Sequence, residues 1–187
     1  PKREEGGLAI LHGNIAPKGA VVKVSGVKPS MHYFEGRARV FHSMEEASYA
    51  VSNDQIRYGD ILVITYEGPK GGPGMREMHM TTSLIVGRGM DESCALITDG
   101  RFSGSTRGPC IGYISPEAAA GGPIALIHEG DMITVDIEGG RLDVDVSDEE
   151  LEARRASFVA PAPKHDHGVL AKYAKLVSSA DKGAYIG

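Results

Sequence analysis

Short apolar segments separated by glycine recur along the whole chain, and this alternation restricts the fold more than any other feature of the sequence. Eight segments of four to six residues are apolar or alternate between apolar and polar residues, which is typical of short β-strands. Several begin after a turn dipeptide such as Gly59-Asp60 or Gly130-Asp131, in which glycine adopts positive φ angles without steric cost. This spacing predicts an open or closed β-barrel with strands at residues 8–11, 20–24, 38–41, 61–66, 94–98, 124–128, 132–137 and 142–146.

Glycine supplies 25 of the 187 residues, about twice its usual share of ~7%. Without a repeating period, such a content indicates tight turns and loops that approach a ligand closely. Hydrophobic residues at 41% and charged residues at 24% exclude disordered and fibrous classes, and the length suits one domain. Cys94 and Cys110 are too few for a disulfide framework and lack C-x-x-C spacing, so we expect buried free thiols.

Charge and hydropathy narrow the expected partners and location. Lys and Arg number 20 against 25 Asp and Glu, a net charge of −5, and no basic cluster indicates nucleic-acid binding. No apolar run approaches the ~20 residues that span a bilayer, and residues 1–5 lack the apolar core of a signal peptide. We therefore expect a cytoplasmic protein without membrane or nucleic-acid partners. Pro1 stands in place of an initiator Met, which suggests a fragment of a longer chain.

Helix signals are fewer than strand signals. Ser43 followed by Glu46 is a capping box, and Pro116 suits the first position of a second helix. Residues 160–168 are rich in proline and polar residues and are interpreted as a linker to a C-terminal helix. The expected helices are residues 44–51, 116–120, 148–154 and 169–177, with residues 76–86 a weaker candidate because Thr81, Thr82 and Val86 have low helix propensity.

The first candidate for chemistry is the loop at residues 66–78, which contains four glycines and two prolines directly after an apolar strand. A strand, a glycine loop and a helix in succession present backbone N–H groups that hold anions, so an anion or metal site is one interpretation. The loop is not a phosphate-binding P-loop, because no Gly-Lys-Ser/Thr follows Gly68 at the required spacing. The alternative is an irregular turn with Glu77 on the surface.

The second candidate is the loop at residues 96–108, where an acid, two arginines and three hydroxyl residues crowd into positions 99–107 after another apolar strand. Strand ends of this kind are frequent places for active sites. A serine hydrolase is disfavoured, because Arg101 occupies the position two before Ser103 at which a nucleophile elbow requires glycine. The alternative is that Asp99-Gly100 and Ser103-Gly104 are only turn residues.

Other polar clusters are assigned no chemistry. His128-Glu129 is not followed by the second histidine of a zinc protease, and His165 and His167 lie in the expected linker as a solvated pair. The acidic residues between positions 143 and 150 alternate along a strand and enter a helix start, which is typical of a solvated face. We expect no zinc site.

Three motifs together resemble the C-terminal domain of the dihydroxy-acid dehydratase and 6-phosphogluconate dehydratase family. They are Gly68-Pro-Lys-Gly-Gly-Pro-Gly-Met-Arg-Glu-Met78, Thr98-Asp-Gly-Arg-Phe-Ser-Gly104 and Ile111-Gly-Tyr-Ile-Ser-Pro-Glu-Ala-Ala119. The resemblance extends from Gly6-Gly7 to residues 178–184, whose sequence favours the dihydroxy-acid branch of the family. It implies an α/β fold, a β-barrel-like swivelling β/β/α domain of about eight short strands with flanking helices. Residues 1–187 would form the single C-terminal domain of a larger two-domain dehydratase.

The resemblance also implies a reaction, in which a hydro-lyase removes water from a 2,3-dihydroxy acid to give a 2-keto acid in the biosynthesis of valine and isoleucine. Such a reaction needs a base for the C2 proton and a Lewis acid for the departing C3 hydroxyl. Carried over by motif, Ser103 is implied to be the proton acceptor, Glu77 a Mg²⁺ ligand and Arg101 a substrate contact. A serine is a poor base, so Ser103 would act as an alkoxide stabilised by Mg²⁺, backbone amides or a guanidinium such as that of Arg101.

The remaining machinery of the family has no counterpart in this chain. The resemblance implies that an iron-sulfur cluster, either 2Fe-2S or 4Fe-4S, belongs to the N-terminal domain, and that Cys94 and Cys110 are not its ligands. It implies that the N-terminal domain is a partner, that the full-length enzyme is a homodimer, and that the isolated chain is inactive. Two alternatives remain, a sugar-acid (aldonate or 6-phosphogluconate) dehydratase domain and a non-catalytic ligand-binding module. The intact motifs around Ser103 and Glu77 argue against the module.

Overall fold

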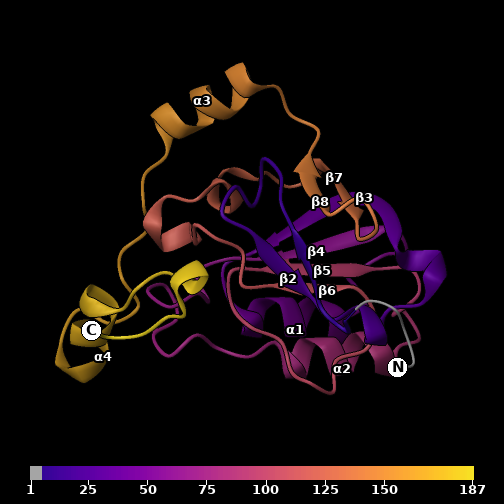
Figure 1. The fold of residues 1–187 in the computed structure, drawn as a ribbon, viewed down its shortest axis with the longest axis horizontal. Helices are drawn as coiled ribbons and strands as arrows, with labels where there is room; N and C mark the ends of the chain where they lie inside the picture. The colour runs from indigo at the N-terminus through magenta and orange to yellow at the C-terminus, as the bar shows by residue number, and fades with distance from the viewer. Residues whose placement is uncertain (1–5) are drawn as a thin grey trace.

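The β-strands form one curved sheet at the centre of the molecule (Figure 1). The structure is a computed structural model that describes residues 6–187, so the expectation about a signal peptide at residues 1–5 lies outside the described residues. Along the sheet the strand order is β1-β2-β6-β5-β4-β3-β7-β8. The strands are β1 (Ala9–Leu11), β2 (Ala20–Val22), β3 (Tyr33–Phe41), β4 (Asp60–Ile64), β5 (Ala95–Thr98), β6 (Cys110–Gly112), β7 (Met132–Asp136) and β8 (Arg141–Val144).

Strand direction divides the sheet into a parallel centre and antiparallel flanks. Strands β3, β4, β5 and β6 are parallel neighbours, whereas β1, β2, β7 and β8 pair antiparallel with their neighbours. The two ends of the sheet meet at His12, which follows β1. Its N–H donates to the carbonyl of Gly140 at 2.9 Å, and its carbonyl accepts from the N–H of Leu142 at 2.8 Å. These bonds nearly close the sheet and confirm the predicted barrel of eight short strands.

The parallel strands are apolar on both faces because both faces are covered. Ile61 and Val63 of β4 point into the barrel interior, and Leu62 and Ile64 pack against helices on the outside. All four side chains are fully buried. Continuous apolar sequence of this kind is the mark of a strand covered on two sides, and burial of one such side chain contributes about 1.5–3 kcal/mol.

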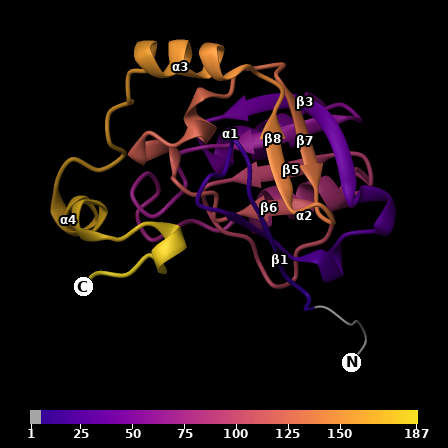
Figure 2. The same ribbon diagram turned by 45° about the horizontal axis from the view of Figure 1, so that its top comes forward.

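Four α-helices flank the sheet, as expected for the α/β class. They are α1 (Met44–Ser52), α2 (His79–Gly87), α3 (Asp148–Ser157) and α4 (Gly168–Leu176). Helices α1 and α2 lie together on the outside of the parallel strands, whereas α3 and α4 lie away from them (Figures 1 and 2). The hydroxyl of Ser43 accepts the N–H of Glu46 at 3.2 Å and caps α1 as predicted. Within residues 6–187, no helix has the length and apolar character needed to cross a membrane.

Two of the predicted elements are wrong. Residues 124–128 do not form a strand, since Gly122-Pro123 starts the 3-10 helix η4 (Pro123–Leu126) and proline has no N–H for a sheet. Residues 116–120 contain only the 3-10 helix η3 (Ala118–Ala120), which the left-handed Gly121 ends after one turn. The eighth strand is instead the three-residue β6, whose brevity hid it among glycines and prolines.

Two predicted elements begin at other residues in the structure, and several segments are irregular or form short 3-10 helices. Strand β3 starts at Tyr33, earlier than the predicted residue 38, and α2 starts at His79, later than residue 76. Residues 158–167 have no regular secondary structure, and their path from α3 to α4 runs along the outside of the molecule (Figure 2). Three further 3-10 helices are η1 (Val24–Gly26), η2 (Pro29–Met31) and η5 (Ala180–Lys182).

Candidate functional site

The carboxyl ends of β3, β4, β5 and β6 lie at one edge of the sheet, because these four strands run parallel. Residues 65–78 follow β4, residues 99–109 follow β5 and residues 113–122 follow β6. Ligand sites of α/β proteins lie outside the carboxyl ends of parallel strands. The structure thus brings together the two loops selected from the sequence and adds a third.

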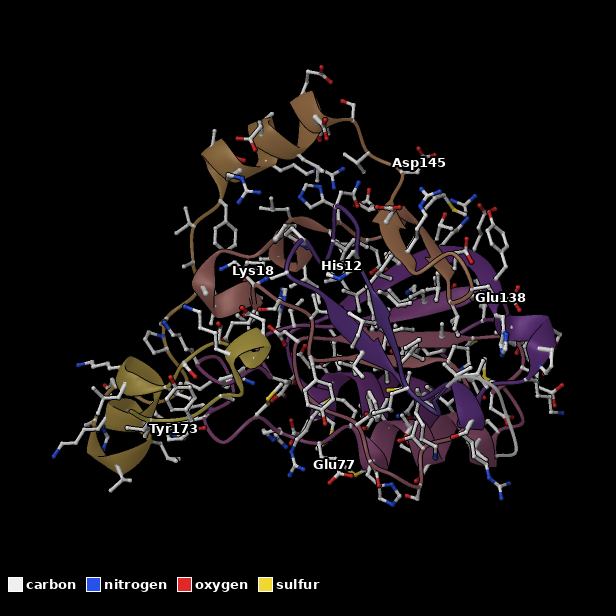
Figure 3. All side chains as sticks on the ribbon, in the orientation of Figure 1. His12, Lys18, Glu77, Glu138, Asp145 and Tyr173 are labelled. Atoms are coloured by element: carbon white, nitrogen blue, oxygen red, sulfur yellow. The ribbon has the colours of Figure 1, made fainter. Side chains whose placement is uncertain are left out.

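Glu77 and Arg101 are bridge partners across the first two loops, and Glu77 lies where the chain enters α2 (Figure 3). The N–H of Met78 donates to the carbonyl of Arg101 at 2.9 Å, and the N–H of Arg101 donates to the carbonyl of Arg76 at 3.0 Å. The Arg101 guanidinium donates from Nε to the carbonyl of Met75 at 2.7 Å and lies 4.0 Å from Glu77 Oε2. Both charged side chains are partly exposed, so the two loops present a carboxylate beside a guanidinium.

The Ser103 hydroxyl is held within its own turn. Its Oγ atom accepts the N–H of Ser105 at 3.2 Å and lies 2.9 Å from the Ser105 hydroxyl. The carbonyl of Ser103 accepts the N–H of Thr106 at 3.1 Å, which closes the turn. Within residues 6–187, the hydroxyl makes no hydrogen bond to Arg101 or Glu77. An anionic Ser103 would therefore be stabilised by a backbone amide, as the sequence allowed, rather than by direct contact with Arg101.

Lys23 places a positive charge on the loop that carries Ser103. Its Nζ atom donates to the carbonyl of Thr106 at 3.1 Å and also to the carbonyl of Gly104. Sequence reasoning missed Lys23, because a single lysine after a short strand carries no motif. Its proximity depends on the pairing of β2 with β6, which joins segments about 90 residues apart, Val21 lying opposite Gly112.

Backbone strain is concentrated in the same loops. Tyr66, Met75 and Tyr113 adopt left-handed φ angles of 61°, 58° and 59°, although none of them is glycine. Such conformations cost of order 1–3 kcal/mol each and cluster at functional sites. The ring of Tyr113 packs edge-on against Phe102 at 5.3 Å, so one of the strained residues contacts the Ser103 loop.

Asp99 anchors two neighbouring loops from a fully buried position. Its Oδ2 atom accepts the N–H of Tyr66 at 3.2 Å and of Ala118 at 2.9 Å, and Oδ1 accepts the N–H of Glu67 at 3.0 Å. Burial raises the pKa of the Asp99 carboxyl to about 6, although these hydrogen bonds oppose the shift. Asp99 therefore serves as a structural acceptor and is not available as a ligand in solvent.

Glu117 is likewise a buried acceptor, and it anchors the loop at residues 66–78, called here the glycine loop. Its carboxylate accepts the N–H groups of Lys70 and Gly71, each at 2.9 Å from Oε2, and burial raises its pKa to about 7. A Cβ atom on Gly68 would lie 2.6 Å from Glu117 Oε2, and one on Gly72 would lie 2.7 Å from Glu67 Oε2. The glycines of this loop are thus required because the backbone lies directly on buried carboxylates.

Sequence reasoning assigned no role to Glu67, Asp99 and Glu117. The available signal was their position, since Glu67 and Asp99 follow the buried strands β4 and β5 within three residues. A carboxylate at such a position can be buried only if hydrogen-bond donors compensate for its lost contact with water. Here those donors come from loops that are distant in the sequence.

A cavity of about 990 Å³ opens at the same edge but is separate from the Glu77, Arg101 and Ser103 side chains. Its wall combines the end of β3 and the glycine loop with residues 158–166 and α4. Val40, Ile127 and Phe158 make part of the lining apolar, and Lys70 and Lys164 add positive charge. The exposed pair His165 and His167 confirms the predicted solvated histidines.

The cysteines are buried free thiols, as predicted. Cys94 and Cys110 lie in the core between the sheet and helices α1 and α2, and burial raises the pKa of Cys110 to about 12. Among residues 6–187, no three His, Cys, Asp or Glu side chains gather as a metal-binding group. Glu77 therefore does not belong to a group of three such side chains within the described residues.

The family described as "Dihydroxy-acid/6-phosphogluconate dehydratase C-terminal" matches residues 1–184. A dihydroxy-acid dehydratase of Geotalea daltonii is 62% identical over 184 residues, which are 98% of this chain and 33% of that protein. Those of Syntrophotalea carbinolica and Acetivibrio thermocellus are 59% and 56% identical, over 97% and 100% of this chain and 33% and 34% of theirs. The chain spans about a third of the length of these relatives, and it belongs to the dihydroxy-acid/6-phosphogluconate dehydratase C-terminal family.

Proposed function

We propose that this chain is the part of a dihydroxy-acid dehydratase that supplies the base and one Mg²⁺ ligand for conversion of a 2,3-dihydroxy acid to a 2-keto acid. The observation that carries the proposal is the bridge between Glu77 and Arg101, which joins the loop of the ligand to the loop of Ser103 at the carboxyl edge of parallel strands. The relatives named dihydroxy-acid dehydratase support this substrate class over sugar acids.

Glu77 fits a Mg²⁺ ligand. Its carboxylate is partly exposed, and its nearest cationic partner, Arg101, lies 4.0 Å away, so its oxygens are free to bind a hard cation. Bound Mg²⁺ would polarise the oxygen atoms of the substrate. Arg101 retains donors beyond the one given to the Met75 carbonyl, and these suit the carboxylate of the substrate.

Iron-sulfur ligation does not fit the residues of this chain. Cys94 and Cys110 are free thiols buried in the core between the sheet and helices α1 and α2, and neither is exposed on the surface of the chain. We infer that any cluster ligands lie in the part of the relatives that this chain does not span, and that the isolated chain is inactive.

Ser103 accepts the C2 proton in this proposal. Its Oγ atom, as an alkoxide, receives the C2 proton while the C2–C3 double bond forms and the C3 hydroxyl leaves as hydroxide, whose departure a bound Lewis acid would assist. The Ser103 hydroxyl returns a proton to this hydroxide, which leaves as water and restores the alkoxide, and the enol tautomerises to the 2-keto acid. The N–H and hydroxyl of Ser105 donate to Oγ, and the ammonium of Lys23 adds positive charge on the same turn. These contacts lower the cost of the alkoxide before the substrate binds.

The test is release of 2-keto acid from 2,3-dihydroxyisovalerate by the full-length enzyme with its cluster intact. Ser103→Ala is expected to lower kcat by about 10²–10⁴-fold while substrate still binds, since this is the usual contribution of a general base. Glu77→Gln should raise the Mg²⁺ concentration required for half-maximal activity, and Ser157→Ala on α3 is the matched control for Ser103→Ala. Full activity of both site variants would contradict the assignment, and turnover of sugar acids alone would leave the base in place but overturn the substrate class.

A further inference from the structure

Glu67 is a buried carboxylate on which three separate segments converge. Its side chain is fully buried, and its Oε1 atom accepts the N–H of Met44 at the start of α1 at 2.9 Å. The same atom lies 3.4 Å from Arg76 Nη1 and 3.3 Å from Lys164 Nζ. Its Oε2 atom has no hydrogen-bond partner within the described part of the chain. A buried carboxylate with one unsatisfied oxygen costs stability, which points to a function beyond packing.

Arg76 connects Glu67 with the surface of α1. Its guanidinium donates two hydrogen bonds to Glu45 in the first turn of α1. The Nη1 atom that donates one of them also lies 3.4 Å from Glu67 Oε1. The hydrogen bond from Arg76 lowers the pKa of the Glu45 carboxyl, and both side chains of this pair are exposed to solvent. Exposed ion pairs contribute little, whereas a pair with a fully buried carboxylate is screened much less. Glu67 is therefore the buried anchor of Arg76, whereas Glu45 is the exposed anchor and makes the shorter contacts.

Arg76 is also the residue directly before Glu77. Its carbonyl accepts the N–H of Arg101 at 3.0 Å, so the main chain at this point is attached to the loop of Ser103. Its side chain attaches the same point to α1 through Glu67. Glu77 thus follows a residue whose main chain is bonded to the Ser103 loop and whose side chain contacts Glu67. Arg76 and Glu77 together lie at the end of a loop with four glycines.

We propose that Glu67 is a positioning residue that acts through Arg76 to hold the Glu77 carboxylate in place for a divalent cation. The proposal rests on the proposed function of Glu77 as a ligand. Outer partners that orient a metal ligand typically change metal affinity by 10–100-fold when they are removed. Lys164 supplies a second positive charge that keeps Glu67 balanced.

The test is Mn²⁺ binding to the full-length protein, followed by electron paramagnetic resonance of free Mn²⁺, together with the thermal unfolding midpoint. Glu67→Gln keeps an oxygen for the Met44 N–H but loses the charge, and it is expected to raise the Mn²⁺ dissociation constant about 10-fold. Glu45→Gln removes the exposed partner of the same Arg76 and is the matched control, expected to stay within about twofold. A purely structural Glu67 would lower the unfolding midpoint without changing the Mn²⁺ affinity, which would overturn the proposal.

A second variant keeps the test decisive if Glu67→Gln does not fold. Arg76→Gln breaks the same connection from its exposed end and should raise the dissociation constant to a similar extent. The double variant should then bind Mn²⁺ no more weakly than either single variant, because the effects of two substitutions that break one connection are not additive. Independent effects would overturn the proposal. Glu77→Gln separates the two claims, since unchanged Mn²⁺ binding in that variant would refute the ligand assignment itself.

Discussion

The Oδ1 atom of Asp99 accepts the backbone N–H of Glu67 at 3.0 Å, so a buried carboxylate after β5 holds the main chain of a buried carboxylate after β4. Glu67 in turn holds the first N–H of α1, which follows β3. Glu117, after β6, holds the glycine loop after β4. Acidic side chains therefore connect the loops at the carboxyl edge of the parallel strands to one another, and the acceptor oxygens come from residues that the sequence places far apart.

This arrangement predicts that stability falls as the pH rises from about 4 to about 7. The pKa of Asp99 is raised from 3.8 to about 6 and that of Glu117 from 4.5 to about 7, so the folded state binds more protons than the unfolded state in this window. Their stabilising contribution is complete below the unfolded pKa values and is lost through the folded ones. The shift at Asp99 alone corresponds to about 3 kcal/mol at 1.36 kcal/mol per unit. Urea unfolding of the chain at several pH values between 4 and 8 measures this fall in the free energy of unfolding.

The control for this pH dependence is Asp99→Asn. It should flatten the slope between pH 4 and pH 6, and it should destabilise at pH 5 by about 1–3 kcal/mol, because its NH₂ group faces backbone donors that the carboxyl accepted. The lowered pKa values of Glu45 and Asp131 act below about pH 4.5 and oppose the slope only at the acid end of this window. An unchanged slope in the variant would show that Asp99 does not titrate as described.

Arg154 is predicted to attach α3 to the barrel. Its guanidinium forms two hydrogen bonds with Asp131, at 2.6 Å and 3.2 Å, and a third with the carbonyl of Leu126 at 3.0 Å. Both charged side chains are nearly buried. Arg154→Met should lower the free energy of unfolding by about 1.5–3 kcal/mol, the range for hydrogen bonds to charged groups. Arg155→Met, next in sequence but mostly exposed, should cost less than about 1 kcal/mol, and equal costs in urea unfolding would refute the attachment.

Cys94 and Cys110 are predicted to be unreactive in the folded chain. Both thiols are buried, and burial raises the pKa of each, to about 12 for Cys110, so the reactive thiolate is scarce at neutral pH. A thiol reagent such as DTNB should label both cysteines after unfolding in urea and neither one beforehand. Rapid labelling of the folded chain would contradict the burial and reopen the question of metal ligation.

The barrel interior is predicted to be sensitive to loss of volume. Ile97 of β5 is fully buried there, and Ile97→Ala should lower the free energy of unfolding by about 2–5 kcal/mol through lost burial and the cavity left behind. Ile10 of β1 carries the same side chain but is 55% exposed, so Ile10→Ala should cost within about 0.5 kcal/mol. Urea unfolding of the two variants compares them, and a similar cost at both positions would argue against the described interior.

Much of the fold was predictable because strands and helix starts are local signals. Seven of the strands lie at apolar segments that were recognised, Ser43 caps α1 where expected, and α3 begins at the predicted residue 148. The failure at residues 124–128 has a local cause as well, since an apolar segment does not distinguish a strand from a turn that begins at Pro123. Strand β6 was missed because its sequence, Cys-Ile-Gly, follows Pro109 and ends in glycine, so it shows no apolar run like those of β1 and β2.

The residues of the candidate site separate into those that a motif marked and those that only the fold brings together. Glu77, Arg101 and Ser103 stand in recognisable sequence motifs, but their relative placement depends on β4 and β5 being parallel neighbours. Lys23 and the buried Glu67 became visible only with their partners, Thr106 for one and Met44, Arg76 and Lys164 for the other.

The sequence by itself determined the apolar periods, the turns and the helix caps, together with the family and the motifs that carry its chemistry. The tertiary structure alone decided which loops meet, which carboxylates are buried and which backbone N–H groups they accept. The physical reason is that a period or a cap depends on residues within a few positions of one another, whereas the burial and pKa of Asp99 or Glu117 depend on strands that pair across the chain. Long-range pairing in the order β6-β5-β4-β3 creates that environment.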